Sequence, residues 1–186
     1  MVDTTSLFLH VLAAIGMVGG GIVQVLAGTR LRGAGTGAAI GQWARFTRSA
    51  GTLIAASAVV SLLTGGHLAG AVWGGDAGGF ANPFITLGVV GLVVLAPIGP
   101  MVGGARLREL GQAGEELGDG QASAALVADA RAPGVWGPVH SLVGVGVGLV
   151  ALMVYKPGWV VGTLVLIVTF GVGWVAGSMV AARAAR

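Results

Sequence analysis

Residues 6–28 read SLFLHVLAAIGMVGGGIVQVLAG and establish the fold class of this chain. The only polar side chains in the stretch are Ser6, His10 and Gln24. A helix needs about 20 apolar residues to cross the hydrocarbon core of a bilayer. The apolarity is continuous and lacks the alternation of a membrane β-barrel strand. The stretch therefore predicts a transmembrane helix.

Four further stretches share this character, and none carries Lys, Arg, Asp or Glu in its middle. They cover residues 49–70, 83–105, 135–155 and 159–182. Together with the first, they predict an all-α polytopic membrane helix bundle of five transmembrane helices, in one membrane domain over residues 1–186. The polar link over residues 107–134 is predicted to be a cytoplasmic loop that forms short surface helices, broken near residues 118–120.

The composition excludes several classes of protein. Of the 186 residues, 36 are Gly, 55% are hydrophobic and only 9% are charged. Soluble domains carry about 25% charged residues, so the sequence argues against a soluble enzyme or a nucleic-acid-binding module. The chain has no Cys, which excludes disulfides, thiolate metal sites and a cysteine nucleophile. It also has no carboxylate in the middle of an apolar stretch, which argues against an acidic proton relay.

Basic residues are distributed unevenly between the two sides that five crossings create. Nine of the ten fall on one side and only Lys156 falls on the other. Cytoplasmic segments attract Lys and Arg, so the N-terminus is predicted outside and the C-terminus inside. We expect a multi-pass protein of a bacterial-type inner membrane. The nine residues are Arg30, Arg32, Arg45, Arg48, Arg106, Arg108, Arg131, Arg183 and Arg186.

Small residues recur at a spacing of four in several apolar stretches, a pattern that lets helix backbones approach closely. The pairs are Gly16 and Gly20, Gly99 and Gly103, Gly144 and Gly148, and Gly173 and Gly177. They predict helix contacts within the chain, or contacts with other membrane subunits or a second copy. The remaining predicted partner is the lipid bilayer, and no nucleic acid is expected. Pro97 and Pro100 predict a kink in the third stretch.

Three histidines are the main candidates for chemistry, because a titratable group at membrane depth is a functional hypothesis by default. His10 lies roughly 6 Å inside the outer end of the first stretch, and His67 roughly 4–5 Å inside the outer end of the second, at a rise of about 1.5 Å per residue. The two are therefore expected at one level on consecutive antiparallel helices. His140 enters from the inner side, where a role at a helix start is expected.

Two imidazoles at one depth suit the axial ligands of haem b or the ligands of a copper ion. His10 is the principal candidate ligand and His67 the second, for either cofactor. Met17 lies two turns below His10 on the same helix face and either extends a copper path or packs. The alternative for both histidines is a structural role, with hydrogen bonds across helices or contacts with lipid headgroups.

Several short motifs resemble a known family of predicted integral membrane proteins, domain of unknown function 2269. The matching residues are 9–14 followed by Gly19 and Gly20, residues 63–65, Trp136 and residues 152–157. That family carries no assigned activity. The first stretch is also similar, more distantly, to CopD-type copper-resistance proteins and to HemJ-type protoporphyrinogen oxidases. In the latter a histidine of the first helix is a haem ligand, so the resemblance implies that role for His10.

The sequence thus leaves two functional hypotheses open. The first is a haem- or copper-binding membrane protein that carries out redox chemistry or handles metal. The second is a membrane subunit without catalytic activity, or a small-solute transporter, with no cofactor. Colour and metal content of the purified protein separate the two.

Overall fold

The computed structural model describes residues 1–95, 101 and 103–184 of the chain. Over these residues, five helical stretches are long and apolar enough to cross a membrane, as expected for a multi-pass membrane protein. The described helices are α1 (Val2–Arg32), α2 (Gly37–Ala71), α3 (Pro83–Leu95), α4 (Gly104–Leu117), α5 (Ala124–Ala130), α6 (Pro133–Tyr155) and α7 (Trp159–Ala184), with the short 3₁₀ turns η1 (Gly75–Ala77) and η2 (Gly79–Ala81) before α3. The predicted all-α fold is confirmed for this part of the chain.

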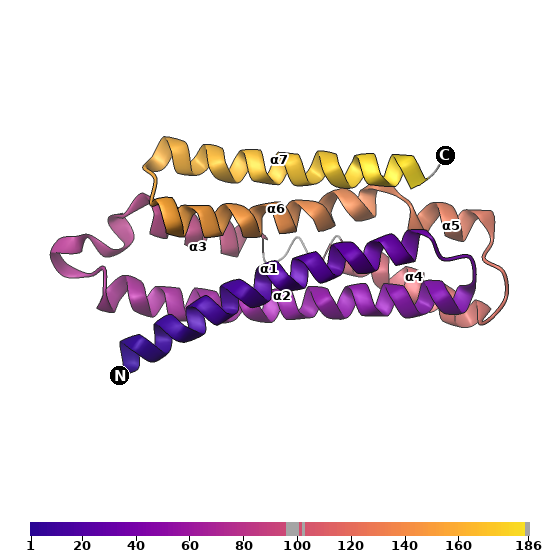
Figure 1. The fold of residues 1–186 in the computed structure, drawn as a ribbon, viewed down its shortest axis with the longest axis horizontal. Helices are drawn as coiled ribbons and strands as arrows, with labels where there is room; N and C mark the ends of the chain where they lie inside the picture. Colours follow the sequence, from indigo (N-terminus) through magenta and orange to yellow (C-terminus); the bar gives the residue numbers. More distant parts are fainter. Residues whose placement is uncertain (96–100, 102, 185–186) are drawn as a thin grey trace.

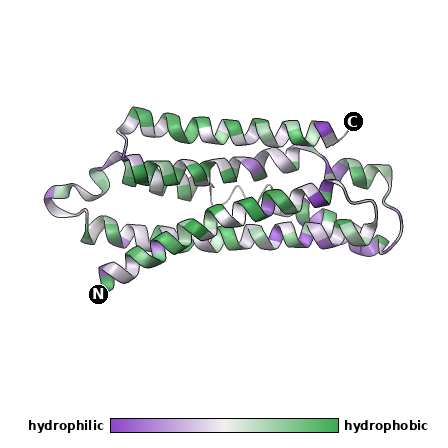
Figure 2. Ribbon diagram, viewed as in Figure 1, coloured by the Kyte–Doolittle hydropathy of each residue, from purple (hydrophilic) through white to green (hydrophobic). Residues whose placement is uncertain are grey.

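The long helices form two antiparallel pairs (Figure 1). One pair is α1 with α2, the other is α6 with α7, and α1 joins the pairs by packing against α6. The α1–α2 connection, α4, α5 and the end of α7 gather at one end of the bundle, here called the basic end. The N-terminus, residues 72–82 and the α6–α7 turn lie at the opposite end. Hydrophilic residues concentrate at the basic end, while the shafts of the helices are largely hydrophobic (Figure 2).

Helix α2 is longer than the apolar stretch that predicted it. It begins at Gly37, twelve residues before the predicted start at residue 49. At about 1.5 Å per residue its 35 residues span roughly 52 Å, well beyond a hydrocarbon core of about 30 Å. The Thr36 hydroxyl caps its first turn by accepting a hydrogen bond from Ala39 N at 3.3 Å. Arg45 and Arg48 therefore lie on a helix that extends past the membrane core, and not in a loop.

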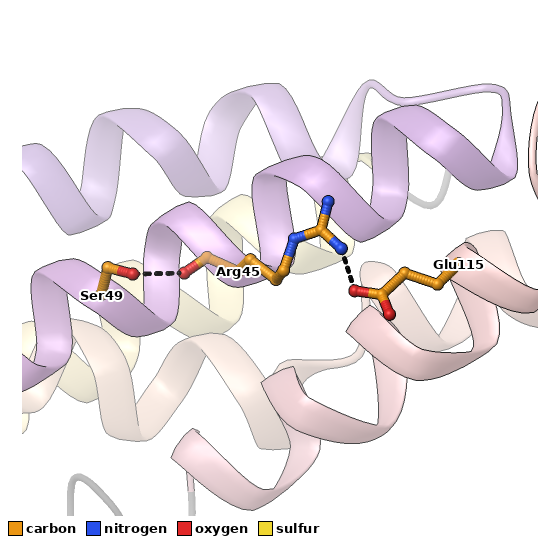
Figure 3. Close-up of polar contacts among 3 residues, drawn as sticks. All are labelled: Arg45, Ser49 and Glu115. Atoms are coloured by element: carbon orange, nitrogen blue, oxygen red, sulfur yellow. Dashed lines mark hydrogen bonds and ion pairs between the residues drawn. The ribbon is translucent and has the colours of Figure 1, made fainter.

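The first turns of α2 form a platform on which α4 docks. Gly114 of α4 lies so close to Gly37 and Gly41 that a side chain at this position would meet backbone atoms of α2. Arg45 of α2 forms an exposed ion pair with Glu115 of α4, and the Ser49 hydroxyl donates to the Arg45 carbonyl at 3.1 Å (Figure 3). The predicted short helices are thus confirmed as α4 and α5. The glycine contacts and the ion pair hold α4 against α2.

Backbone hydrogen bonds also tie the two connections of the basic end together. Ala38 N donates to Gly118 O at 2.6 Å, and Ala122 N donates to Gly35 O at 2.9 Å. The break between α4 and α5 occurs where it was predicted, at Gly118, whose φ of 60° suits a residue without a side chain. The polar link is therefore part of the folded bundle.

Close glycine contacts hold both helix pairs. Gly16 and Gly20 of α1 face α2, where Ser57 and Ile54 are their nearest neighbours. On the other pair, Gly144 and Gly148 face Thr169 of α7, and Gly173 and Gly177 face the backbone of α6 around residues 136–141. Three of the four predicted pairs are thus confirmed as helix contacts within the chain. Gly99, Pro97 and Pro100, and with them the fourth pair and the predicted kink, lie outside the described residues.

Candidate cofactor site

The imidazole of His10 is held by α2. Its Nδ1 lies 3.1 Å from Ser61 O and 3.1 Å from Thr64 Oγ1. Ser61 O is a carbonyl and can only accept, and the Thr64 hydroxyl is 2.6 Å from Val60 O, to which it donates its proton. Both partners are therefore acceptors toward His10. The neutral imidazole must carry its proton on Nδ1, which leaves Nε2 with a lone pair for a ligand.

His10 lines a cavity of about 810 Å³ between α1, α2, α3 and α6, here called the His10 cavity. Its volume lies within the range of about 300–1,000 Å³ that is usual for ligand and cofactor sites. The wall is predominantly apolar, and its larger side chains include Leu7, Val11, Phe84, Ile85, Leu149 and Val150. Among the described residues, no hydrogen-bond partner is found for His10 Nε2. The arrangement thus presents one imidazole nitrogen to a half-open apolar cavity.

A positively charged side chain also lines the His10 cavity. Lys156 and Trp73 both line it, and the Lys156 ammonium lies 4.6 Å from the centre of the Trp73 ring. Lys156 is exposed and ends α6 in the left-handed conformation, with φ 46° and ψ 51°. This cap directs the chain from α6 into the turn before α7. The cavity therefore combines an apolar interior with a positive charge that reaches solvent.

Two thioethers also contribute to the wall. Met17 lies on α1 two turns from His10, as the sequence indicated, and Met153 comes from α6. Met153 belongs to the motif of residues 152–157, but that resemblance gave it no role as a ligand. Its position in an apolar helix carries no local signal, because only the packing of α6 against α1 and α3 brings it to this cavity.

His67 takes a different position from the one expected for a second ligand. Its Nε2 lies 3.0 Å from Asp3 Oδ1, and both side chains are substantially exposed. His67 is not among the described residues that line the His10 cavity. The pair connects the first turn of α1 to the end of α2. The structure therefore does not bring the two imidazoles to one cavity.

His140 lies inside α6, which begins at Pro133, rather than at the helix start. Its Nδ1 is 2.9 Å from Trp136 O, one turn earlier, and its ring meets the Trp136 ring edge-on at 6.4 Å. Trp136 is fully buried and donates from Nε1 to Ala130 O at 2.8 Å, while the Arg32 guanidinium lies over its ring at 4.3 Å. His140 thus belongs to a packed polar cluster at the basic end.

Clusters of conventional metal ligands are not found in the described part of the chain. No group of three or more His, Cys, Asp or Glu side chains there could hold a metal ion. A site built on His10 would thus need a cofactor that brings its own ligands, or thioethers from Met.

The fold and its apolar surface define the class as a multi-pass membrane helix bundle. Comparison of the chain with protein-family models, curated proteins and solved structures finds no match.

Proposed function

We propose that this protein binds haem b in the His10 cavity, where His10 Nε2 would hold the iron, and serves a redox or haem-handling role in the membrane. The observation that carries the proposal is the hydrogen bond from His10 Nδ1–H to the Ser61 carbonyl, at 3.1 Å. Histidines that bind a metal commonly donate their other ring N–H to a carbonyl, which orients the ring and raises the basicity of the ligating nitrogen.

The remainder of the cavity fits this cofactor. A volume of about 810 Å³ and an apolar wall suit a large, flat, mostly hydrophobic molecule. Haem b also carries two carboxylates, which need a cation or water where they leave the apolar interior. Lys156 provides a cation there, and its stacking on Trp73 restricts where that charge lies.

Each residue of the site has a defined task in this proposal. Ser61 O and Thr64 Oγ1 fix the tautomer and orientation of His10. The apolar wall lowers the local dielectric constant, which strengthens electrostatic interactions at the site. Met17 and Met153 are the other side chains of this wall whose sulfur could bind the iron. Haem, when bound, supplies one-electron redox chemistry that the side chains lack.

A copper site is the second candidate, and the two thioethers favour it. Soft thioether ligands select Cu(I), and imidazole also binds copper. His10, Met17 and Met153 would then form the ligand set, with Lys156 left without a role. Haem uses more of the cavity, because a single ion needs only a small part of the enclosed volume.

The experiment is an absorption spectrum of the detergent-purified protein, oxidised and dithionite-reduced, with metal analysis of the same sample. The protein should be produced in cells replete with haem and copper. We expect a Soret band that shifts on reduction, with about one iron per chain. Copper without a Soret band would favour the copper site. A colourless protein free of both metals would overturn the proposal and leave a cofactor-free subunit or transporter.

Variants test the assignment of the ligand. His10→Ala should abolish the Soret band, whereas the matched control His67→Ala should retain it, because His67 pairs with Asp3 and does not line the cavity. Helix content and elution volume of each variant show that the bundle is intact. Thr64→Val removes one acceptor of Nδ1 and should leave haem bound, with an altered reduction potential.

A further inference from the structure

A second cavity lies toward the basic end, between α1, α2, α4 and α6. It has a volume of about 340 Å³ and is here called the Arg48 cavity. Arg48 of α2 and Arg108 of α4 both line it. Its polar groups are distinct from those of the His10 cavity.

The two arginines bring positive charge to this cavity without an acidic partner. The ion pairs formed within the described residues involve Arg45, Arg106 and His67, and neither Arg48 nor Arg108. Both side chains lie on exposed positions of their helices. Guanidinium groups bind phosphate oxygens through two parallel N–H donors. Basic pockets between membrane helices on the cytoplasmic side are suited to anionic lipid headgroups.

Gln24 adds an independent sign of a ligand. It lines the Arg48 cavity and is only 5% exposed. Its Nε2 donates to Thr47 O at 3.2 Å, which places the amide at the level of Arg48, but its Oε1 is buried without a hydrogen-bond partner among the described residues. A buried acceptor without a donor is destabilising, because it has lost its hydrogen bonds to water. Because Oε1 itself is not accessible from the cavity, the Gln24 amide must turn toward the cavity for a ligand hydroxyl to satisfy it.

The apolar part of the cavity indicates what the rest of the ligand is. Met17, Leu92 and Leu149 line both the Arg48 cavity and the His10 cavity. The Arg48 cavity is therefore bounded on this side by apolar side chains that it shares with the His10 cavity. Inorganic phosphate would leave this space unused, whereas a hydrocarbon chain would fill it.

From these contacts we infer that the Arg48 cavity binds an anionic glycerophospholipid whose headgroup bears a hydroxyl. Arg48 and Arg108 bind its phosphate, Gln24 Oε1 accepts from its hydroxyl, and one acyl chain lies along Met17, Leu92 and Leu149. The headgroup contacts do not depend on a cofactor at His10, because Arg48, Arg108 and Gln24 do not line the His10 cavity, whereas the acyl chain and a cofactor would share the wall formed by Met17, Leu92 and Leu149.

The first test uses the unmodified chain in detergent micelles, with phosphatidylglycerol, phosphatidylcholine or inorganic phosphate added. Binding is followed by native mass spectrometry, and thermal stability by circular dichroism. We expect about one phosphatidylglycerol to stay bound per chain and to raise the unfolding temperature. Equal effects of phosphatidylcholine would refute the role of the arginines, and an equal effect of inorganic phosphate would refute the acyl chain.

The second test compares two double variants that each remove two positive charges. Arg48→Gln with Arg108→Gln should weaken phosphatidylglycerol binding by at least about tenfold, since the charge-assisted hydrogen bonds to the phosphate are lost. Arg30→Gln with Arg183→Gln removes exposed arginines that do not line the cavity and should change binding less than twofold. Equal losses in both would indicate only a diffuse attraction and overturn the site.

Gln24→Leu tests the hydroxyl contact. It should weaken binding of phosphatidylglycerol more than that of phosphatidic acid, whose headgroup has no glycerol hydroxyl. Equal weakening of the two lipids would show that Gln24 does not accept from the headgroup.

Discussion

The interface between α6 and α7 offers a sharp test of the packing, because it rests on glycines that face backbone. A Cβ at Gly173 would lie 2.7 Å from Ser141 Cα and 2.8 Å from His140 C. A Cβ at Gly177 would lie 2.7 Å from Trp136 C. Real Cβ atoms essentially never approach other heavy atoms closer than 3.0 Å. Because backbone cannot rotate away as a side chain can, Ala at either position must push the helices apart.

The expected cost follows from two opposing terms. Overpacking a tight site costs about 1–3 kcal/mol, while replacing Gly by Ala in a helix returns up to about 1 kcal/mol. Gly173→Ala should therefore lower the free energy of unfolding by up to about 2 kcal/mol. Gly171 is the matched control on the same helix, since a Cβ there would meet no atom of a neighbouring described segment within 4 Å. Gly171→Ala should be neutral or stabilising by up to about 1 kcal/mol.

The assay is unfolding of the purified protein in mixed micelles with increasing sodium dodecyl sulfate, followed by circular dichroism. The three proteins are compared in one detergent at one protein concentration, so that the difference between the two variants does not depend on extrapolation. A Gly173→Ala protein as stable as Gly171→Ala would refute the close approach of α6 and α7.

Three further predictions concern the basic end and the orientation. The chain has no cysteine, so Ala77→Cys and Ala125→Cys each introduce a single thiol. A membrane-impermeant maleimide should label the thiol at position 77 in intact cells and the thiol at position 125 only after permeabilisation. The reverse labelling pattern would show that the orientation is opposite to the one predicted. Glu115→Ala should lower the free energy of unfolding by less than about 1 kcal/mol and reduce the salt dependence of this free energy, because the ion pair with Arg45 is exposed. A larger loss would mean that the ion pair is buried in the membrane-bound protein. Gly114→Ala should lower the free energy of unfolding by about 1–3 kcal/mol, since a Cβ there would lie 2.9 Å from the Cα of Gly41. Faster proteolysis between α4 and α5 should show that α4 is docked less firmly on α2.

Hydropathy and residue spacing were enough to identify the membrane helices and several of the glycines that pack. Hydropathy is a property of each residue, so a run such as residues 6–28 identifies a membrane helix without knowledge of its neighbours. The spacing of Gly173 and Gly177 likewise predicted a helix contact that the structure confirms, because residues four apart share one face of any helix. The side of the membrane on which each end lies stays a prediction from charge.

Which polar residues meet depends on the packing of the helices in three dimensions. His10 and His67 both lie in apolar stretches of the sequence, but in the packed bundle His10 lines a cavity and His67 pairs with Asp3. The sequence also did not predict that α2 begins at Gly37 or that α4 docks on it. An apolar run ends where the hydrocarbon core ends, whereas the helix continues beyond that point. Cavity walls drawn from four helices, such as those around His10 and Gln24, depend on how side chains from distant segments fill space, and no local pattern encodes that.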